Sequence, residues 1–262
     1  MKKSDDTRPR LDAGLKELRL PAMRAGCAAM ADTARSETLS YEAYLLALCE
    51  AECQERRQKR IERFLHDSRI PREKSLDSLE LKRFGSKAAT QVRSLLDGTF
   101  LERKENLLAF GKPGSGKTHL LCAIGQELIH RGHRVYFSPC SLLVQDLLRA
   151  KQELKLAARL KALAKYDALI IDDIGYVQHD REEMEVLFTL LAERYERGSI
   201  LLTSNLPFSQ WERIFKDPMT TAAAIDRLVH HSVILELNNK SYRMAAAQEK
   251  QKGGNRHAVL GL

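Results

Sequence analysis

The sequence lacks any apolar run that approaches the roughly 20 residues needed to cross a membrane. Its first residues, Met-Lys-Lys-Ser-Asp-Asp, are followed by no apolar segment of the kind found in a secretory signal. Cysteine is sparse, odd in number and scattered, which argues against a disulfide framework and for a reducing compartment. The cysteines are Cys27, Cys49, Cys53, Cys122 and Cys140. These absences predict a cytoplasmic protein without a membrane partner.

Positive charge is in excess, but only at the two ends of the chain. The formal net charge is +8 at pH 7. Residues 1–100 carry 20 Lys and Arg against 16 Asp and Glu, residues 240–262 carry five against one, and the segment between them is neutral. A basic flank beside a neutral core favours binding of a polyanion such as nucleic acid. The alternative is a charge that serves solubility alone.

Many of these basic residues fall on one predicted helix, which runs from an N-cap at Ser40 to about Asp67. We interpret its basic second half as a set of contacts to DNA phosphates, which supply affinity without base specificity. The alternative is a solvated helix face. Cys49 and Cys53 on this helix are expected to be packing residues. The candidate DNA-binding residues are Arg56, Arg57, Lys59, Arg60 and Arg63.

Beyond residue 100, short apolar strands alternate with helices. Strands separated by helices of this length form parallel βαβ units, so the sequence predicts an α/β fold with helices on both faces of a five-stranded sheet. The expected strands are Leu107–Gly111, His133–Pro139, Ala168–Asp173, Ser199–Asn205 and Val233–Leu237. The expected organisation is a small all-helical N-terminal domain (1–70), a connector (71–100), an α/β domain (101–244) and a flexible basic tail (245–262).

The first strand of this region runs directly into Gly-Lys-Pro-Gly-Ser-Gly-Lys-Thr, which fits the phosphate-loop pattern G-x-x-x-x-G-K-[ST]. The glycines let backbone N–H groups surround phosphate oxygens, and the following helix adds the positive end of its dipole. We expect Lys117 to reach the β- and γ-phosphates and the Thr118 hydroxyl to bind Mg²⁺. The predicted nucleotide-binding residues are Gly111, Lys112, Pro113, Gly114, Ser115, Gly116, Lys117, Thr118 and His119.

Polar residues follow two further apolar strands, at the edge of the sheet where ligands bind in open α/β folds. Asp172 is interpreted as a Mg²⁺ ligand and Asp173 as the group that orients or deprotonates an attacking water. Asn205 is a candidate contact to the γ-phosphate or that water. Arg227 is a candidate for stabilising charge on a phosphate held by an adjacent subunit. The alternatives are ordinary strand-end turns for the first three and an internal salt bridge for Arg227.

Other residues receive structural interpretations. A helix is expected over Glu182–Gly198, with Gly198 as its stop. Arg194 and Arg197 near its end are interpreted as cations favoured by the helix dipole. Trp211 is expected to be a buried anchor. No metal pattern is expected from the histidine pairs His130/His133 and His230/His231.

Taken together, these segments closely resemble the IstB family, the ATP-binding helper proteins of a group of bacterial insertion sequences, related to the DnaC and DnaI helicase loaders within the AAA+ ATPases. The resemblance covers about residues 10–245. The phosphate loop specifies only the NTPase class. The segments Arg194–Ser199 and Asp226–His231 are far more specific to the family. The segments that carry it are Gly111–Thr118, Ile171–Tyr176, Arg194–Ser199, Thr203–Phe208, Trp211 and Asp226–His231.

The resemblance implies an AAA+ type P-loop fold and a role for each candidate residue. Lys117 and Thr118 correspond to the Walker A pair, and Asp172 and Asp173 to the Walker B acids. The sensor corresponds to Asn205, and the arginine finger that acts across a subunit boundary corresponds to Arg227. The resemblance also implies that ATP, bound with Mg²⁺ and hydrolysed by the protein, drives homo-oligomeric assembly on double-stranded DNA. The assembly would deform that DNA, and recruit and stimulate a partner transposase of the IstA type. Residues 1–70 would contact DNA and self-associate.

Two departures and two rival functions accompany the resemblance. Many AAA+ proteins carry Glu where this chain has the shorter Asp173. The chain also ends about 20 residues after its last predicted strand, so no full AAA+ lid is expected, and Arg243 is only a weak candidate for the lid arginine. One rival function is a helicase loader, in which residues 1–70 bind a replicative helicase. The other is a small-molecule kinase, for which the sequence offers no acceptor site.

Overall fold

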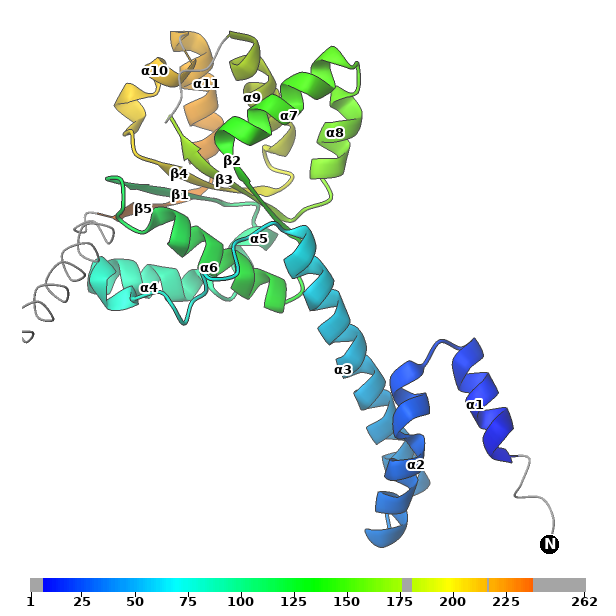
Figure 1. The fold of residues 1–262 in the computed structure, drawn as a ribbon. Helices are drawn as coiled ribbons and strands as arrows, with labels where there is room; N and C mark the ends of the chain where they lie inside the picture. The colour runs from blue at the N-terminus through cyan, green and yellow to red at the C-terminus, as the bar shows by residue number, and fades with distance from the viewer. Residues whose placement is uncertain (1–6, 176–180, 216, 238–262) are drawn as a thin grey trace, which may run out of the picture. The chain divides into compact units, whose positions relative to one another are not determined.

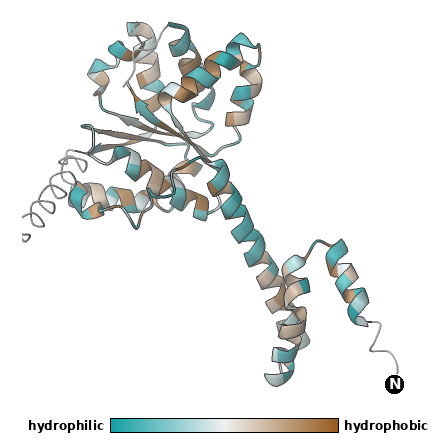
Figure 2. Ribbon diagram, in the orientation of Figure 1, coloured by the Kyte–Doolittle hydropathy of each residue, from teal (hydrophilic) through white to brown (hydrophobic). Residues whose placement is uncertain are grey.

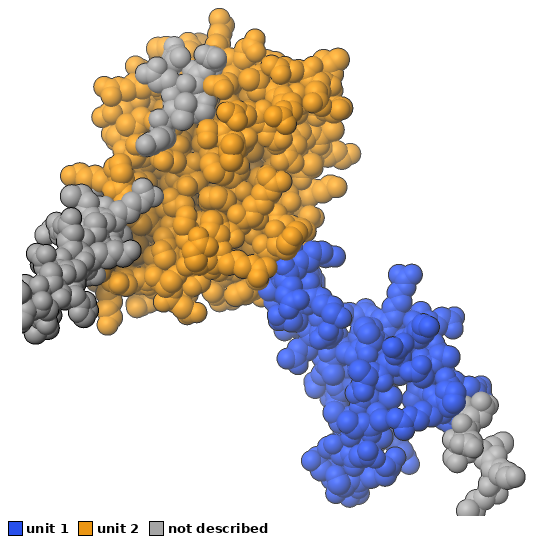
Figure 3. Space-filling model, in the orientation of Figure 1, with its two compact units in different colours: residues 1–63 blue, residues 64–262 orange. Residues whose placement is uncertain are grey.

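The computed structural model describes residues 7–175, 181–215 and 217–237. The chain divides into two compact units, residues 1–63 and 64–262 (Figure 3). The division falls within the long helix α3 (Tyr41–Asp67). Among the described residues, no helix is both long and apolar enough to cross a membrane.

The first unit contains α1 (Thr7–Glu17), α2 (Pro21–Ser36) and α3 as far as Arg63. Its helices share a small apolar cluster built from Leu15, Met23 and Leu48. The predicted N-cap of α3 is confirmed, because Ser40 Oγ accepts a hydrogen bond from the backbone N–H of Ala43 at 3.2 Å.

A buried carboxylate on α3 holds the first unit together. Glu52 accepts hydrogen bonds from the backbone N–H groups of Ala22 (2.8 Å) and Met23 (3.2 Å), and so caps the first turn of α2. Arg56 donates to Glu52 at 3.0 Å and to the carbonyl of Arg19, in the turn after α1, at 2.8 Å. Burial acts to raise the pKa of Glu52, but these hydrogen bonds outweigh it and hold that pKa below its usual value.

The second unit is built on a five-stranded sheet in the order β2-β3-β4-β1-β5, and every neighbouring pair is parallel. The strands are β1 (Asn106–Gly111), β2 (Val135–Pro139), β3 (Ala168–Ile174), β4 (Ser199–Ser204) and β5 (Ser232–Leu237). The helices that accompany them are η1 (Leu81–Phe84), α4 (Gly85–Leu95), α5 (Thr99–Glu102), α6 (Lys117–His130), α7 (Cys140–Gln152), α8 (Leu156–Leu163), α9 (Arg181–Arg194), η2 (Phe208–Gln210), α10 (Glu212–Phe215) and α11 (Pro218–Val229).

Helices cover both faces of this sheet, as the sequence predicts. Helices α4 and α6 lie on one face, and α7 to α11 lie on the other (Figure 1). The strands are the most hydrophobic part of the unit (Figure 2), since apolar side chains on both sides of a parallel sheet face helices. Leu107, Leu108 and Leu201 are fully buried, and so is the predicted anchor Trp211. Strand β1 lies between β4 and β5, and the loop that follows it reaches the carboxyl edge of the sheet beside β4.

The predictions that α9 continues to Gly198 and that Gly198 is its stop are both wrong. The helix ends at Arg194, and Gly198 is not its stop, because the left-handed residue in this turn is Glu196, with φ of 57°. Glycine is required at 198 for another reason. A Cβ atom there would collide with the guanidinium group of Arg194.

Arg194 is a buried cation with a structural role. The interpretation of Arg194 as a cation placed by the helix dipole is therefore wrong. Its guanidinium donates hydrogen bonds to the backbone carbonyls of Leu163 (3.3 Å), Tyr166 (2.7 Å), Asp167 (3.0 Å) and Ser199 (2.9 Å). These contacts join the chain between α8 and β3 to the first residue of β4. Burial lowers the pKa of Arg194 to about 10, so the group remains charged at neutral pH.

The structure also corrects the expectation for the cysteines of α3, because Cys49 and Cys53 are both exposed. Arg243 and the predicted tail 245–262 lie outside the described residues.

We expect Arg194→Ala to lower the free energy of unfolding by about 3 kcal/mol, because four carbonyls lose a charged donor. The matched control is Arg197→Ala, which removes an exposed pair with Glu193 at 3.1 Å and should cost less than about 0.5 kcal/mol. Urea unfolding followed by circular dichroism measures both values. Equal losses in the two variants would contradict the structural role of Arg194.

Candidate nucleotide-binding site

The phosphate loop leaves the end of β1 and enters α6. Gly116, with φ of 95°, is the left-handed residue immediately before that helix, a conformation that glycine adopts without strain. Gly111 has no room for a side chain, because a Cβ atom there would meet the carbonyl oxygen of Leu237 and lie 2.8 Å from Ser115 Oγ. The sequence therefore needs glycine at these two positions to let the backbone turn tightly at the start of α6.

The loop holds its own lysine in place. Lys117 Nζ donates hydrogen bonds to the carbonyl oxygens of Gly111 (2.8 Å) and Lys112 (3.1 Å). Ser115 Oγ is buried and has no hydrogen-bond partner among the described residues. A buried hydroxyl without a partner costs about 1–3 kcal/mol, so it favours the presence of a ligand. The loop thus combines a positive ammonium group, a helix N-terminus and an unsatisfied hydroxyl, a combination that fits a phosphate.

One carboxylate oxygen joins strands β3 and β4 to the start of helix α6 at the carboxyl edge of the sheet. Thr118 Oγ1 donates to Asp172 Oδ1 at 2.7 Å, although the two residues are 54 positions apart in sequence. Thr203 Oγ1 donates to the same oxygen at 2.8 Å. Hydroxyl and carboxylate oxygens are the ligands that Mg²⁺ prefers, so Thr118 and Asp172 fit a magnesium ion.

Asp173 leaves the regular ladder directly after this contact. Its φ is 66°, a left-handed conformation that costs a residue with a side chain about 1 kcal/mol, and the pairing of β3 with β4 is irregular between Ile171 and Ile174. The Asp173 backbone N–H donates to Thr203 Oγ1 at 2.7 Å. Thr203 therefore positions both acids. Sequence reasoning missed it, although it stands in the same polar strand end, Thr-Ser-Asn, that suggested Asn205.

Asn205 follows β4 and lies beside the start of the phosphate loop. With Gly111 and Lys112 it lines a cavity of about 360 Å³. Its Oδ1 atom is buried and has no hydrogen-bond partner in the described part of the chain. This oxygen can therefore accept a hydrogen bond from a water molecule or a ligand, and the role of Asn205 as a sensor stays a prediction.

The predicted connector forms a wall of the site. A cavity of about 270 Å³ lies between Lys74, Ser78 and Leu79 on one side and the phosphate loop on the other. His119 Nε2 lies 3.0 Å from Ser78 Oγ and 3.1 Å from the carbonyl oxygen of Ser75, which holds the connector against α6. No local sequence signal indicates this arrangement, because it depends on contacts between residues more than 40 positions apart.

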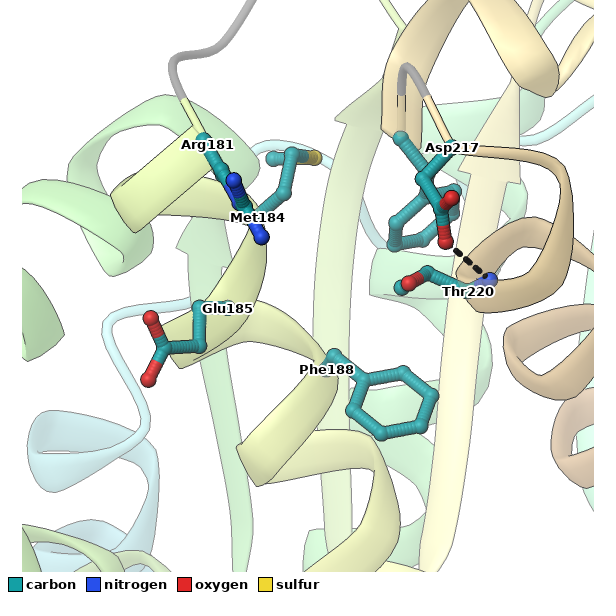
Figure 4. Close-up of a pocket in the computed structure, with 7 residues that line it drawn as sticks. Arg181, Met184, Glu185, Phe188, Asp217 and Thr220 are labelled. Carbon is teal, nitrogen blue, oxygen red and sulfur yellow. Dashed lines mark hydrogen bonds between the residues drawn. The ribbon is translucent and has the colours of Figure 1, made fainter.

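Arg227 contacts Phe188 and Ala223 of its own chain. Its guanidinium carbon lies 4.7 Å from the centre of the Phe188 ring, and it donates to the carbonyl of Ala223 at 3.0 Å. Phe188 also lines a cavity of about 540 Å³ between α9 and the α10–α11 segment (Figure 4). Across that cavity, Asp217 accepts from the backbone N–H of Thr220 at 2.7 Å and caps α11. The assignment of Arg227 as a finger acting on another subunit stays a prediction.

The basic residues predicted to bind DNA lie on the second half of α3, which is strongly hydrophilic (Figure 2). All five are exposed along the helix. Lys59 pairs with Glu55 at 2.9 Å, and this partner raises the pKa of Lys59. Arg56 has the internal contacts to Glu52 and Arg19 described above. Contact of these residues with DNA stays a prediction.

The sheet order, the phosphate loop and the acid at the end of β3 define a P-loop nucleotide-binding protein of the AAA+ type. Solved structures have the same fold. The crystal structure of DnaI matches with a TM-score of 0.55 and 21% identity over 65% of this chain and 95% of that one. AMPPCP-bound DnaA from Aquifex aeolicus matches with a TM-score of 0.55 and 20% identity over 71% of this chain and 57% of that one.

Within that class, the chain belongs to the family of IstB-like ATP binding proteins, whose model matches residues 13–251. A relative from Sinorhizobium fredii, described as an insertion sequence ATP-binding protein, is 42% identical over 96% of this chain and 85% of its own length. A relative from Geobacillus stearothermophilus, described as an ATP-binding protein of insertion sequence IS5376, is 40% identical over 90% of this chain and 95% of its own. The resemblance seen in the sequence is confirmed.

We expect Thr203→Val to weaken Mg²⁺-dependent ATP binding by about 10-fold or more, because the variant loses the hydroxyl that holds Asp172 and the Asp173 backbone. Thr203→Ser keeps the hydroxyl and should bind within about 2-fold of the unmodified protein. Calorimetric titration with and without Mg²⁺ measures the effect. Equal affinities for the Val and Ser variants would show that this hydroxyl does not organise the site.

Proposed function

We propose that this protein is an ATP-dependent, DNA-binding helper of insertion-sequence transposition. It oligomerises on double-stranded target DNA, deforms that DNA, and recruits and stimulates a partner transposase of the IstA type. The observation that carries the proposal is the contact of Thr118 and Thr203 with Asp172, in a chain whose relatives are described as insertion sequence ATP-binding proteins.

In this proposal the site hydrolyses ATP to ADP and phosphate. Lys117 and the loop N–H groups bind the β- and γ-phosphates, and Asn205 orients a water molecule beside the γ-phosphorus. The water oxygen bonds to phosphorus as the bond to the ADP oxygen breaks, and the water proton passes to Asp173. Mg²⁺ held by Thr118 and Asp172 would neutralise charge on the phosphates.

The proposal also makes nucleotide a switch for assembly. Arg227 leaves its contacts with Phe188 and Ala223 and meets the γ-phosphate bound by a neighbouring subunit. A guanidinium over an aromatic ring is a modest interaction, worth about 0.5–2 kcal/mol, so a phosphate can compete for it. Loss of the γ-phosphate on hydrolysis then weakens the subunit contact.

A helicase loader is the second candidate function, and the observation that favours it is the fold shared with DnaI. The identity to DnaI is 21% and concerns the fold, whereas the 42% identity to an insertion sequence relative spans 96% of this chain. Co-purification with the transposase or with the replicative helicase of the same cell separates the two functions.

The assembly switch predicts that the protein forms large particles only when duplex DNA and a non-hydrolysable ATP analogue are both present. Lys117→Ala should remain unassembled, because it loses the ammonium group that binds the phosphates. Arg227→Ala should bind ATP normally yet lose assembly and at least about 10-fold in hydrolysis. Analytical ultracentrifugation and electron microscopy measure assembly.

Arg213→Ala is the matched control, since Arg213 is an exposed arginine of the neighbouring helix α10. It should assemble and hydrolyse ATP like the unmodified protein. Normal assembly by Arg227→Ala would contradict the finger assignment, and assembly without any nucleotide would contradict the switch.

DNA binding through α3 predicts a strong dependence on salt. Affinity falls as salt rises, and replacing Arg57, Lys59 and Arg60 by Ala should make the slope of log affinity against log salt concentration less steep by about 2 to 3. The reason is that binding releases about one counterion fewer for each phosphate contact that is lost. The measurement is fluorescence anisotropy with duplex DNA at several salt concentrations.

The control for this set removes the same charge from helices α7 and α8 and the turn that follows them. It should leave the salt slope nearly unchanged. An equal change in both triple variants would indicate that net charge, and not α3, is responsible. The control substitutions are Arg149→Ala, Lys161→Ala and Lys165→Ala.

A further inference from the structure

Two turns at the amino end of the sheet bring together the two segments that are most specific in the family resemblance. Residues 194–199 connect α9 to β4, and residues 226–231 form the end of α11 and the entry to β5. The Tyr195 hydroxyl and His230 Nδ1 are 2.9 Å apart, although the residues are 35 positions apart in sequence. The phosphate loop of the same chain lies at the opposite, carboxyl end of the strands, so nucleotide bound by that loop does not account for this contact.

Three potential metal ligands meet at this contact. Glu196, His230 and His231 each offer a ligand atom, and these atoms all lie within 4.8 Å of one another. The two imidazole rings have their centres 4.2 Å apart. Two imidazoles and one carboxylate form a ligand set typical of zinc sites that keep a fourth position open to water. We propose that Glu196, His230 and His231 bind a divalent transition-metal ion of the zinc type.

Backbone contacts fix the turns that carry these ligands. Beside Glu196, the Gly198 N–H donates to the carbonyl of Arg194 at 3.0 Å, and Arg194 is itself anchored to the four carbonyls described above. Beside the histidines, the Asn106 N–H donates to the carbonyl of His231 at 2.7 Å. The ligands therefore stand on anchored turns of the α/β unit, and only side-chain rotations are needed to gather them around an ion.

Tyr195 supplies the kind of supporting contact that metal-binding histidines have. A ligating imidazole usually engages a partner through its second nitrogen, which fixes the orientation of the ring. The Tyr195 hydroxyl engages Nδ1 of His230, and Nε2 is then the nitrogen open to an ion. Glu105, the other carboxylate near His231, is occupied by Arg103, which donates to it at 2.8 Å and 2.9 Å.

The chemistry of this cluster differs from that of the nucleotide site. Magnesium prefers oxygen ligands such as those of Thr118 and Asp172, whereas imidazole ligands favour zinc and neighbouring transition metals. The two sites are thus expected to select different ions. Sequence reasoning assigned no metal pattern to the histidines because the third ligand, Glu196, comes from a different turn.

A bound ion joins the turn after α9 to the end of α11. Arg227 lies on the last turn of α11, before the two histidines. The ion therefore restrains the helix end from which Arg227 projects, and it should raise the thermal stability of the α/β unit by mass action.

The test uses the full chain without a histidine tag, stripped with chelator and dialysed. Calorimetric titration with ZnCl₂ should give one equivalent of bound zinc, and CoCl₂ should give a visible absorption band. His231→Ala and Glu196→Gln should each weaken zinc binding by at least about 10-fold. Each variant should melt at the same temperature as the unmodified protein in EDTA, which shows that it folds.

Two controls remove exposed ligands that lie elsewhere in the chain. His66→Ala removes an exposed histidine elsewhere, and Cys49→Ser with Cys53→Ser removes the exposed thiols of α3. Both controls should retain the zinc equivalent. Absence of zinc uptake by the unmodified protein, or uptake that survives in His231→Ala but disappears in the cysteine variant, would overturn the proposal.

Discussion

The site depends on one carboxylate oxygen that accepts hydrogen bonds from two threonines. Asp172 ends an apolar strand, Thr118 opens the helix after the phosphate loop, and Thr203 stands on the strand between them in the sheet. This contact sets the distance between the loop that can bind phosphates and the acids that can bind a metal and activate water. Ser115 Oγ and Asn205 Oδ1 are buried and have no hydrogen-bond partner in the part of the chain that the structure describes.

The parallel sheet gives the second unit two chemically different ends. At the carboxyl ends of the strands, oxygen atoms, an ammonium group and a helix N-terminus fit a magnesium nucleotide. At the amino ends, two imidazoles lie close to Glu196, and the buried guanidinium of Arg194 joins the chain before β3 to the start of β4. Helix α11 and β5 connect the two ends, since Arg227 precedes the histidine pair and β5 runs back to contact the phosphate loop at Gly111.

Much of this arrangement follows from local sequence signals, because apolar runs, phosphate-loop glycines and an N-cap at Ser40 act within a few residues. The five parallel strands and the helices on both faces were predictable on that basis. Features that depend on contacts across the fold were not. The sequence predicts Gly198 to be a helix stop. In the structure, the buried Arg194 guanidinium leaves no room for a Cβ atom at this position. The supporting hydroxyl of Thr203 and the meeting of Glu196 with the histidines likewise require three-dimensional proximity between distant segments.

The most direct test of the central claim is the gain in ATP affinity that Mg²⁺ provides, measured for the unmodified chain and for Asp172→Asn. If Asp172 joins the loop to a magnesium site, Mg²⁺ should tighten ATP binding by about 10-fold or more in the unmodified chain and give little gain in the variant. The same gain in both proteins would contradict the account, because the contact around Asp172 would then have no part in holding the nucleotide.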